Sequence, residues 1–235
     1  MPKTVVKIAA AAIVVAAGYA GYTALKPPFW QTGAPLRAGS APVDLLADLD
    51  TGNLTEGWKE RRFFRVTPTD YRMTTEDDAP ALRCTTNHGA SILARDTDIA
   101  LDDLAILSWQ WKVTQPIQST LDEDTHEGDD HPLRYYLRFV NDTGEEKSTE
   151  IIWSNKKYAA GDFKIIGDFY HLVANGLDAN VGTWHDQTVD LRKLYADIGG
   201  IGDARLDVIG FFCDSDNTRT NSDGFFRNIR LSPAP

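Results

Sequence analysis

The chain has 235 residues, of which 34 are Asp or Glu and 24 are Lys or Arg, so its formal net charge is -10. This acidic excess argues against nucleic acid or an anionic membrane surface as the main partner, because both are bound through basic patches. The length allows one sizeable hydrophobic core or two small ones, and the charge permits divalent cations, cationic partners and neutral ligands such as sugars.

The N-terminal segment has the pattern of a membrane anchor. Residues 8–25 contain no charged side chain, and a helix of this length spans about 27 Å, close to the roughly 30 Å hydrocarbon thickness of a bilayer. Lysines precede it, and the positive-inside rule places them in the cytoplasm. We therefore expect a cytoplasmic segment at 1–7, a transmembrane anchor at 8–26 and the rest of the chain in the periplasm. A signal peptide cleaved near Gly18–Ala20 is the alternative.

The remainder of the chain is predicted to be mostly β-strand. Residues 27–43 are rich in Gly, Pro, Ala and Ser, which is typical of a linker, so we expect the folded domain at 44–235. Apolar and polar side chains alternate with period two in 106–113, where Trp109 and Trp111 share the apolar face and are predicted to pack in the core rather than to stack on sugars. The other expected strands are 62–66, 70–75, 80–86, 91–95, 133–140, 149–153, 163–172, 184–189, 206–213 and 224–231.

One helix is predicted, at 190–199. Apolar side chains recur there at i, i+3, i+4 and i+7, with Asp190 as the N-cap and Gly199 as the stop. Many short strands, turn signals such as 141–144 and a single helix favour a mainly β fold. We expect an antiparallel two-sheet sandwich or jelly roll, because a parallel α/β fold would need a helix between most strands.

The two cysteines, Cys84 and Cys213, both lie in expected strands. In an oxidising compartment they would be able to form a disulfide. Two buried free thiols are the alternative, because sequence spacing alone does not show that the two strands are neighbours.

Two acidic segments flank expected strands. Glu127, Asp129 and Asp130 come just before the strand at 133–140, and acids resume directly after the strand at 206–213. If these strands are antiparallel, both segments lie on one rim of the sandwich. Carboxylates that are crowded together need a cation, arginine partners or exposure to water.

We expect this rim to bind a polar ligand. Asn155 follows a third strand, and Tyr136 lies on the face of its strand opposite the core, between Arg134 and Arg138. The candidate ligand-binding residues are Glu127, Asp129, Asp130, Tyr136, Asn155, Asp214, Asp216 and Asn217.

Several alternatives compete for the same acids. Ca²⁺ takes six to eight oxygen ligands, and its candidate ligands here are Asp129, Asp130, Asp214 and Asp216, although no EF-hand spacing is present. Solvated turns or ion pairs with Arg134 and Arg138 would explain the acids without a ligand. His126 and His131 flank the first segment and are a weaker zinc or copper candidate.

Five segments together resemble a known family over about residues 48–231. They are ASILARDTDIALDDLAILSWQWKV, EGDDHPLRYYLRF, IIWSN, DVIGFFCDSDNT and GFFRNIRL. The pattern resembles the bacterial domain-of-unknown-function family numbered 3047. The resemblance implies a galactose-binding-like β-sandwich, similar in outline to carbohydrate-binding modules, and it brings no established activity or cofactor with it.

The expected function is a non-catalytic, membrane-anchored binding module in the periplasm, attached to a bacterial inner membrane, with a glycan or another polar molecule as its ligand. No nucleophile elbow, zinc-protease helix, phosphate loop or dinucleotide fingerprint is present, although a carboxylate pair of a glycoside-active enzyme is not excluded. The alternative is an accessory subunit of an inner-membrane complex, docked through its transmembrane helix and its periplasmic domain.

Overall fold

The computed structural model describes residues 34–55 and 57–235. The expected cytoplasmic segment at 1–7 and the expected anchor at 8–26 lie outside these residues. Within the described ranges, no helix has the length and apolar character needed to cross a bilayer.

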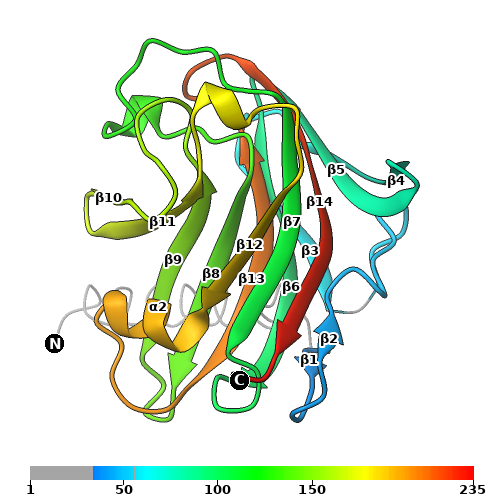
Figure 1. Cartoon of the computed structure of the whole chain (residues 1–235), viewed down its shortest axis with the longest axis vertical. Helices are drawn as coiled ribbons and strands as arrows, with labels where there is room; N and C mark the ends of the chain where they lie inside the picture. Colours follow the sequence, from blue (N-terminus) through cyan, green and yellow to red (C-terminus); the bar gives the residue numbers. More distant parts are fainter. Residues whose placement is uncertain (1–33, 56) are drawn as a thin grey trace, which may run out of the picture.

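The described chain folds into two β-sheets that pack face to face (Figure 1). The larger sheet contains β1 (Leu36–Arg37), β3 (Trp58–Arg62), β6 (Ala90–Ala100), β8 (Arg134–Asn141), β9 (Glu146–Trp153), β10 (Phe163–Ile166), β11 (Phe169–Asn175) and β13 (Ala204–Asp214). The smaller sheet contains β2 (Val43–Asp44), β4 (Asp70–Glu76), β5 (Ala79–Asn87), β7 (Ile106–Gln115), β12 (His185–Asp190) and β14 (Asn221–Ser232).

The strand order places distant parts of the sequence next to each other. The larger sheet runs β1-β6-β13-β8-β9-β11-β10, with β3 also paired to β6, and the smaller sheet runs β12-β7-β14-β5-β4, with β2 paired to β14. The predicted two-sheet sandwich is therefore confirmed, and the strand pairs of the smaller sheet are antiparallel, but the larger sheet is mixed. The pairs β1/β6 and β9/β11 are parallel.

The core between the sheets is built on aromatic rings. Trp109 and Trp111 of β7 are buried, as predicted, and Tyr135 of β8 lies within 5.1 and 6.3 Å of them, measured between ring centroids. Because side chains of a strand alternate between its two faces, Arg134, Tyr136 and Arg138 lie on the outer face of the larger sheet when Tyr135 faces the core.

Two expected strands differ from the structure. The strand expected at 163–172 is a hairpin, because Gly167 adopts a positive φ of 61° and reverses the chain between β10 and β11. The strand expected at 62–66 is β3, which ends at Arg62, and a turn follows in which Arg65 has a φ of 62°. Inside the segment expected to be a linker, Leu36–Arg37 pairs with β6.

The predicted helix is α2 (Leu191–Asp197), which lies across one end of the sandwich (Figure 1). The Asp190 carboxylate accepts hydrogen bonds from the backbone N–H of Arg192 and Lys193 and so caps the helix. Leu191 and Leu194 are buried, so α2 closes this end of the core. The opposite end carries the short 3₁₀ helices η1 (His126–Gly128) and η2 (Asp178–Asn180).

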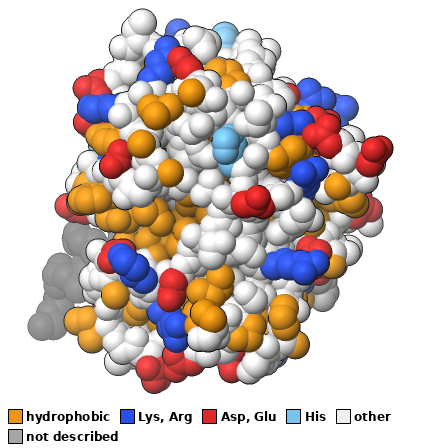
Figure 2. Space-filling model, viewed as in Figure 1, with side chains coloured by type: hydrophobic (Ala, Val, Ile, Leu, Met, Phe, Trp, Pro, Cys, Tyr) orange, Lys and Arg blue, Asp and Glu red, His pale blue; other side chains and the backbone are white. Residues whose placement is uncertain are grey.

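The larger sheet extends past the smaller one along β10 and β11. Phe163 and Ile165 of β10 are each 55% exposed there, and Phe163 stacks on Tyr170 at 5.3 Å between ring centroids. Figure 2 shows hydrophobic side chains gathered on this part of the surface, between the hairpin and α2. Most other large apolar side chains in the described ranges are at least partly buried.

A disulfide joins the two sheets. It links Cys84 of β5, in the smaller sheet, to Cys213 of β13, in the larger sheet. Both cysteines are buried, and Cys213 directly precedes the acidic segment that begins at Asp214.

Candidate functional site

The two acidic segments meet at one end of the sandwich, as the antiparallel arrangement predicts. β8 and β13 are antiparallel, with Arg134 opposite Phe212. The backbone N–H of Asp214 donates to the carbonyl oxygen of His131 at 3.2 Å, and the His131 N–H donates to Asp214 Oδ1 at 2.8 Å. The segments 126–131 and 214–217 therefore lie side by side, at the end opposite α2.

The Asp130 side chain points into the protein, and its hydrogen bonds hold the segments 126–131 and 214–217 together. Its carboxylate accepts hydrogen bonds from the backbone N–H and the hydroxyl of Thr218, both at 2.6 Å, and from the N–H of Asn217 at 3.4 Å. The side chain is fully buried. Asp130 is thus part of the framework of the rim rather than of its surface.

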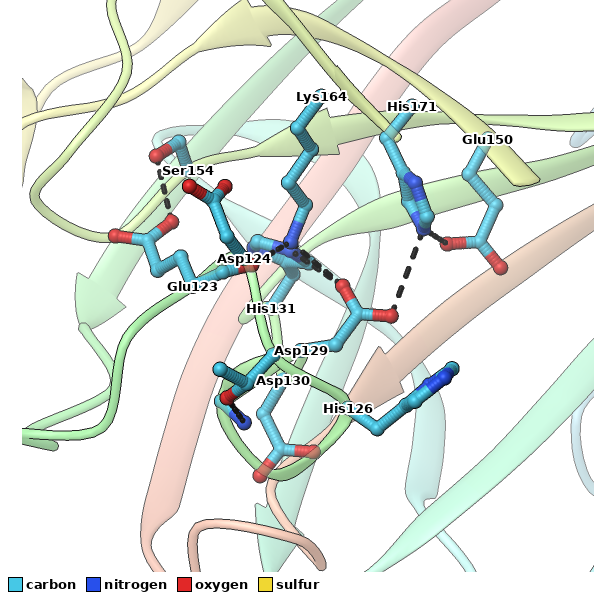
Figure 3. A network of polar contacts seen from close by, with 12 residues as sticks. Glu123, Asp124, His126, Asp129, Asp130, His131, Glu150, Ser154, Lys164 and His171 are labelled. Atoms are coloured by element: carbon cyan, nitrogen blue, oxygen red, sulfur yellow. Dashed lines mark hydrogen bonds and ion pairs between the residues drawn. The ribbon is translucent and has the colours of Figure 1, made fainter. Parts of the chain in front are cut away.

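Asp129 turns the other way, onto the outer face of the larger sheet (Figure 3). Lys164 of β10 places its Nζ 2.6 Å from Asp129 Oδ1. His171 of β11 lies between two acids, with its Nε2 3.5 Å from Asp129 Oδ2 and 3.5 Å from Glu150 Oε2. Side chains from three strands therefore surround this one carboxylate.

Arg134 occupies the centre of the network. It is 2% exposed, and its guanidinium forms ion pairs with Asp214 and, at 2.6 Å, with Glu150. Burial alone would lower the pKa of Arg134, but Asp214 and Glu150 raise that pKa well above its ordinary value. The guanidinium carbon also lies 4.3 Å from the centroid of the Phe212 ring. Of the explanations considered for the rim acids, an ion pair with Arg134 is the one that the structure shows for Asp214.

A cleft of about 350 Å³ opens beside this network, on the outer face of the larger sheet. It extends from β13 across β8 and β9 to β11, because its lining residues come from these strands and from the rim. Four carboxylates line it: Asp129, Glu150, Asp214 and Asp216. Three aromatic rings line it as well: Phe63, which follows β3, Phe212 of β13 and Phe169 of β11.

Half of the predicted ligand-binding residues line this cleft. Asp129, Asp214, Asp216 and Asn217 do so, and Asn217 donates through Nδ2 to the carbonyl oxygen of His126 at 3.0 Å. These four residues come from the two segments that were expected to converge.

The other half lie elsewhere. Glu127 is exposed on η1, outside the cleft lining. Tyr136 is on the correct face of β8, but its ring packs against an apolar cluster around Val208 and its hydroxyl contacts Ser148 at 2.9 Å. Asn155 is buried and donates to the backbone oxygen of Asp130 at 2.8 Å. Asn155 and Asp130 therefore build the rim without lining the cleft.

The sequence analysis did not identify Glu150, His171 or the three phenylalanines. Glu150 stands opposite Tyr136 and beside His171 only in the register of the sheet. The sequence offers two signals: a charged residue directly before the apolar residues of β9, and a second Phe at position 212, which interrupts the alternation of β13. Neither signal locates a cleft without knowledge of the strand pairing.

Glu123 is a further residue that the sequence analysis missed. Its carboxylate accepts hydrogen bonds from Ser154 Oγ and from the backbone N–H of Asn155, Lys156 and Lys157, at 2.7 to 3.0 Å. Burial alone would raise the pKa of Glu123, but these donors contribute to lowering it. Glu123 thus fixes the loop after β9 in the place where it supports the rim.

Residues 56–230 match the model of a family described as a protein of unknown function (DUF3047). The chain belongs to this family. The resemblance noted in the sequence is thereby confirmed over most of the described domain. No curated protein matches this DUF3047 chain in sequence.

Solved structures with a similar arrangement of strands include carbohydrate-binding proteins. One is a family 11 carbohydrate-binding module from Clostridium thermocellum in complex with a mixed-linked tetrasaccharide, with 10% identity, a TM-score of 0.42, and coverage of 79% of this chain and 94% of that one. Another is the xyloglucanase domain of NopAA from Sinorhizobium fredii, with 10% identity, a TM-score of 0.44, and coverage of 75% and 93%. The mannan-recognising module TmCBM27 has 14% identity, a TM-score of 0.34, and coverage of 84% and 98%.

The acids of the DUF3047 rim are a poor set of ligands for calcium. Oxygen atoms of Asp130, Asp214 and Asp216 lie within 4.8 Å of one another, whereas Asp129 is paired with Lys164 and stands outside this group. Donors already occupy the carboxylates of Asp130 and Asp214. A hard cation binds through carboxylate oxygens that are not engaged by other donors. The contacts of Asp130 and Asp214 therefore do not favour a metal ion at this place.

The histidine pair does not form a metal site. Among the described residues, the one group with metal-like spacing contains three aspartates and no histidine. His131 is fully buried and donates through Nδ1 to the carbonyl oxygen of Trp153 at 3.0 Å, whereas His126 is exposed and lines the cleft. The two side chains therefore have separate surroundings.

The Asp129 carboxylate makes stability depend on pH. Burial alone would raise its pKa, but contacts with His131 and His171 and the charge of Arg134 hold the pKa of Asp129 far below its ordinary value. The stability contributed by this carboxylate is present above the unfolded-state pKa of about 4 and is lost as the pH falls below it. We expect Asp129→Asn to lower the free energy of unfolding by about 2 kcal/mol near neutral pH, and this difference to shrink towards acid.

Urea denaturation at a series of pH values measures that difference. Asp102→Asn is the matched control, because Asp102 is exposed in the loop between β6 and β7, at the far end of the sandwich. Its effect is expected to stay within about 0.5 kcal/mol at every pH. A difference for Asp129→Asn that did not change with pH would contradict this assignment.

Proposed function

We propose that the chain is a non-catalytic binding module, anchored in a bacterial inner membrane with its sandwich domain in the periplasm, and that its ligand is a glycan held in the cleft on the outer face of the larger sheet. The observation that carries the proposal is the composition of the cleft. Aromatic rings stand there beside charged groups that donate and accept hydrogen bonds.

This composition suits a sugar. A pyranose ring presents C–H groups on its faces, which pack on aromatic rings, and hydroxyl groups around its edge, which hydrogen-bond to charged side chains. Phe63, Phe169 and Phe212 offer the rings. Arg134 is almost completely buried, and its Nε has no hydrogen-bond partner among the described residues. Because this Nε is also enclosed, ligand hydroxyl groups would hydrogen-bond instead to the accessible polar side chains of the lining, which include His126, Asp216 and Asn217.

The ion pairs of the carboxylates favour binding over hydrolysis, although burial raises the pKa of Asp214 and of Asp216, the direction that suits a general acid. Glycoside hydrolysis needs one carboxylic acid that is protonated and a second carboxylate that attacks or activates water. Asp129 is held by Lys164, and Arg134 holds both Glu150 and Asp214. Three of the four carboxylates in the cleft are therefore engaged in ion pairs.

The proposed location rests on two features. The uncharged segment at 8–25 has the length of a membrane span, and the disulfide between the two sheets is of the kind that persists in oxidising compartments. Protease treatment of spheroplasts tests this location, because a periplasmic domain would be digested without lysis and a cytoplasmic domain would be protected.

Two neighbouring phenylalanines provide a matched test of the cleft. Phe63 lines the cleft, whereas Phe64 is 87% exposed and does not. We expect Phe63→Ala to weaken glycan binding about tenfold, or about 1.4 kcal/mol, because a ring face is lost. Phe64→Ala is expected to leave the affinity unchanged.

Glycan-array screening of the full-length chain would identify an oligosaccharide, and calorimetry with it would compare the two variants. Binding to no glycan on the array would reject the proposal. Equal losses for Phe63→Ala and Phe64→Ala would show that the sugar binds outside the cleft.

The accessory-subunit alternative has one supporting observation. The apolar surface at Phe163, Ile165 and Tyr170 lies on the edge strand β10 and its neighbour β11, and exposed apolar patches are typical of contact surfaces. Stoichiometric copurification of a membrane protein from detergent extracts would favour this alternative over a free receptor.

A further inference from the structure

The cleft contains more negative than positive charge. Four carboxylates line it, and Arg134 is the one lysine or arginine among the described residues of its lining. Lys164 adds a second cation from behind Asp129, with its side chain 1% exposed. Lys164 forms an ion pair with Asp129, and Arg134 forms ion pairs with both Glu150 and Asp214. The two cations therefore do not balance the charge of all four carboxylates.

Among the described residues, Asp216 is the one carboxylate of the cleft lining without an ion pair, although backbone N–H groups hydrogen-bond to it. It is half-buried in the lining, and the described residues offer it no ion pair within 4.0 Å. A carboxylate oxygen of Asp216 lies within 4.8 Å of those of Asp130 and Asp214, so two further acids are close to it. Burial and then the charge of Asp130 raise the pKa of Asp216. A cation placed against this side chain would relieve both costs.

The aromatic rings indicate what kind of cation fits. Phe63 and Phe212 lie 6.0 Å apart between ring centroids. The Arg134 guanidinium lies over the Phe212 ring at 4.3 Å, and the Arg61 guanidinium lies over the Phe63 ring at 5.3 Å, so these rings already contact cations of the protein. Ring faces attract ammonium and guanidinium groups, whereas a hard metal ion requires oxygen ligands that are engaged elsewhere in this rim. Asp216 and the rings line the same cleft, where an organic ammonium group has both an acid and ring faces available to it.

We propose that the glycan bound in this cleft carries free amino groups, as in an N-deacetylated sugar polymer, and that Asp216 receives the ammonium group. The inference rests on the proposed function, since it names the class of glycan that occupies the same cleft. A neutral sugar would leave the charge of Asp216 uncompensated. An acidic sugar would be repelled by the four carboxylates. An N-acetylated sugar lacks the positive charge.

Calorimetry with three tetrasaccharides of identical β-1,4 linkage tests this inference on the full-length chain in detergent. The probes are the oligomers of glucosamine, of N-acetylglucosamine and of glucose, at a pH where the glucosamine amine is protonated. We expect the glucosamine oligomer to bind at least about tenfold more tightly than the other two, a difference of about 1.4 kcal/mol.

Asp216→Asn is expected to remove this preference and to leave the weaker binding of the glucose oligomer in place. The amide keeps the shape of the side chain and removes only its charge. Asp102→Asn is the matched control, because it removes the same charge from an exposed loop at the far end of the sandwich. Asp102→Asn is expected to leave the preference intact.

The possible outcomes separate the inference from the proposed function. Equal binding of the three oligomers, or tighter binding of an uncharged one, would overturn the amino-sugar inference while the glycan-binding proposal stands. Binding of none would reject both. Loss of the preference in Asp102→Asn as well as in Asp216→Asn would show that general surface charge attracts the amine. Tighter binding of tetralysine than of the glucosamine oligomer would make the cleft a site for cationic peptides and would also overturn the inference.

Discussion

Replacing Arg134 with methionine is expected to lower the free energy of unfolding by about 3–5 kcal/mol. Methionine approximates the length of the arginine stem but has no charge. The substitution leaves the carboxylates of Glu150 and Asp214 buried without a cation, with side-chain exposures of 7% and 5%. Removing one partner from a buried ion network costs far more than the network contributes relative to apolar residues, because the remaining charges stay desolvated.

Urea denaturation followed by tryptophan fluorescence measures this loss. Arg37→Met is the matched control, since Arg37 pairs with Asp98 at 3.0 Å but its side chain is 73% exposed. Exposed pairs contribute about 0–1 kcal/mol. Combining Arg134→Met with Glu150→Gln and Asp214→Asn is expected to recover part of the stability, because these two side chains are then no longer buried charges without their cation. Equal small losses for Arg134→Met and Arg37→Met would contradict the central role of Arg134.

The convergence of the acidic segments was predictable because it depends on one relation between strands. Asp214 ends β13 and the 126–131 segment precedes β8, so antiparallel pairing of these two strands is sufficient to bring them together. The burial of Trp109 and Trp111 was predictable for a similar reason, since alternation within one strand decides which face they occupy. Both predictions needed only local patterns.

The cleft itself was not predictable from those patterns. Asp129 and Asp130 are adjacent in a loop, and the periodicity of a strand does not determine which of them turns outward. The structure turns Asp129 towards Lys164 and Asp130 towards Thr218. His171 reaches the site only because β11 pairs in parallel with β9, a pairing that follows a hairpin that the sequence analysis had interpreted as one long strand.

The position of the cleft depends on the hydrogen bonds that hold the loops of the rim in place. Asp130 and Glu123 use their carboxylates inside the protein, where they hold backbone N–H groups of neighbouring loops. With these loops fixed, Asp129, Asp214 and Asp216 are held over the outer face of the sheet. Charges on a rigid framework of this kind do not need to reorganise when a ligand arrives, which favours binding.

The disulfide is expected to be the second large contribution to stability. Cys84 and Cys213 are separated by 129 residues, and closing a loop of this size restricts the unfolded chain strongly. Removing such a bond typically costs about 2–5 kcal/mol. We expect the double variant Cys84→Ala with Cys213→Ala, and the reduced wild-type chain, to lose stability by this amount in urea denaturation with and without reductant. The double variant should not respond to reductant.

Reduction of the Cys84–Cys213 disulfide is also expected to weaken ligand binding in the cleft. Cys213 lies between Phe212 and Asp214, which both line the cleft, and it connects β13 to the smaller sheet behind it. A loss of global stability alone would leave the affinity of the folded fraction unchanged. Weaker glycan binding by the double variant, measured where it is still fully folded, would show that the bond also positions Phe212 and Asp214. If reductant shifts the denaturation midpoints of wild type and double variant equally, the two sheets are not joined through these cysteines.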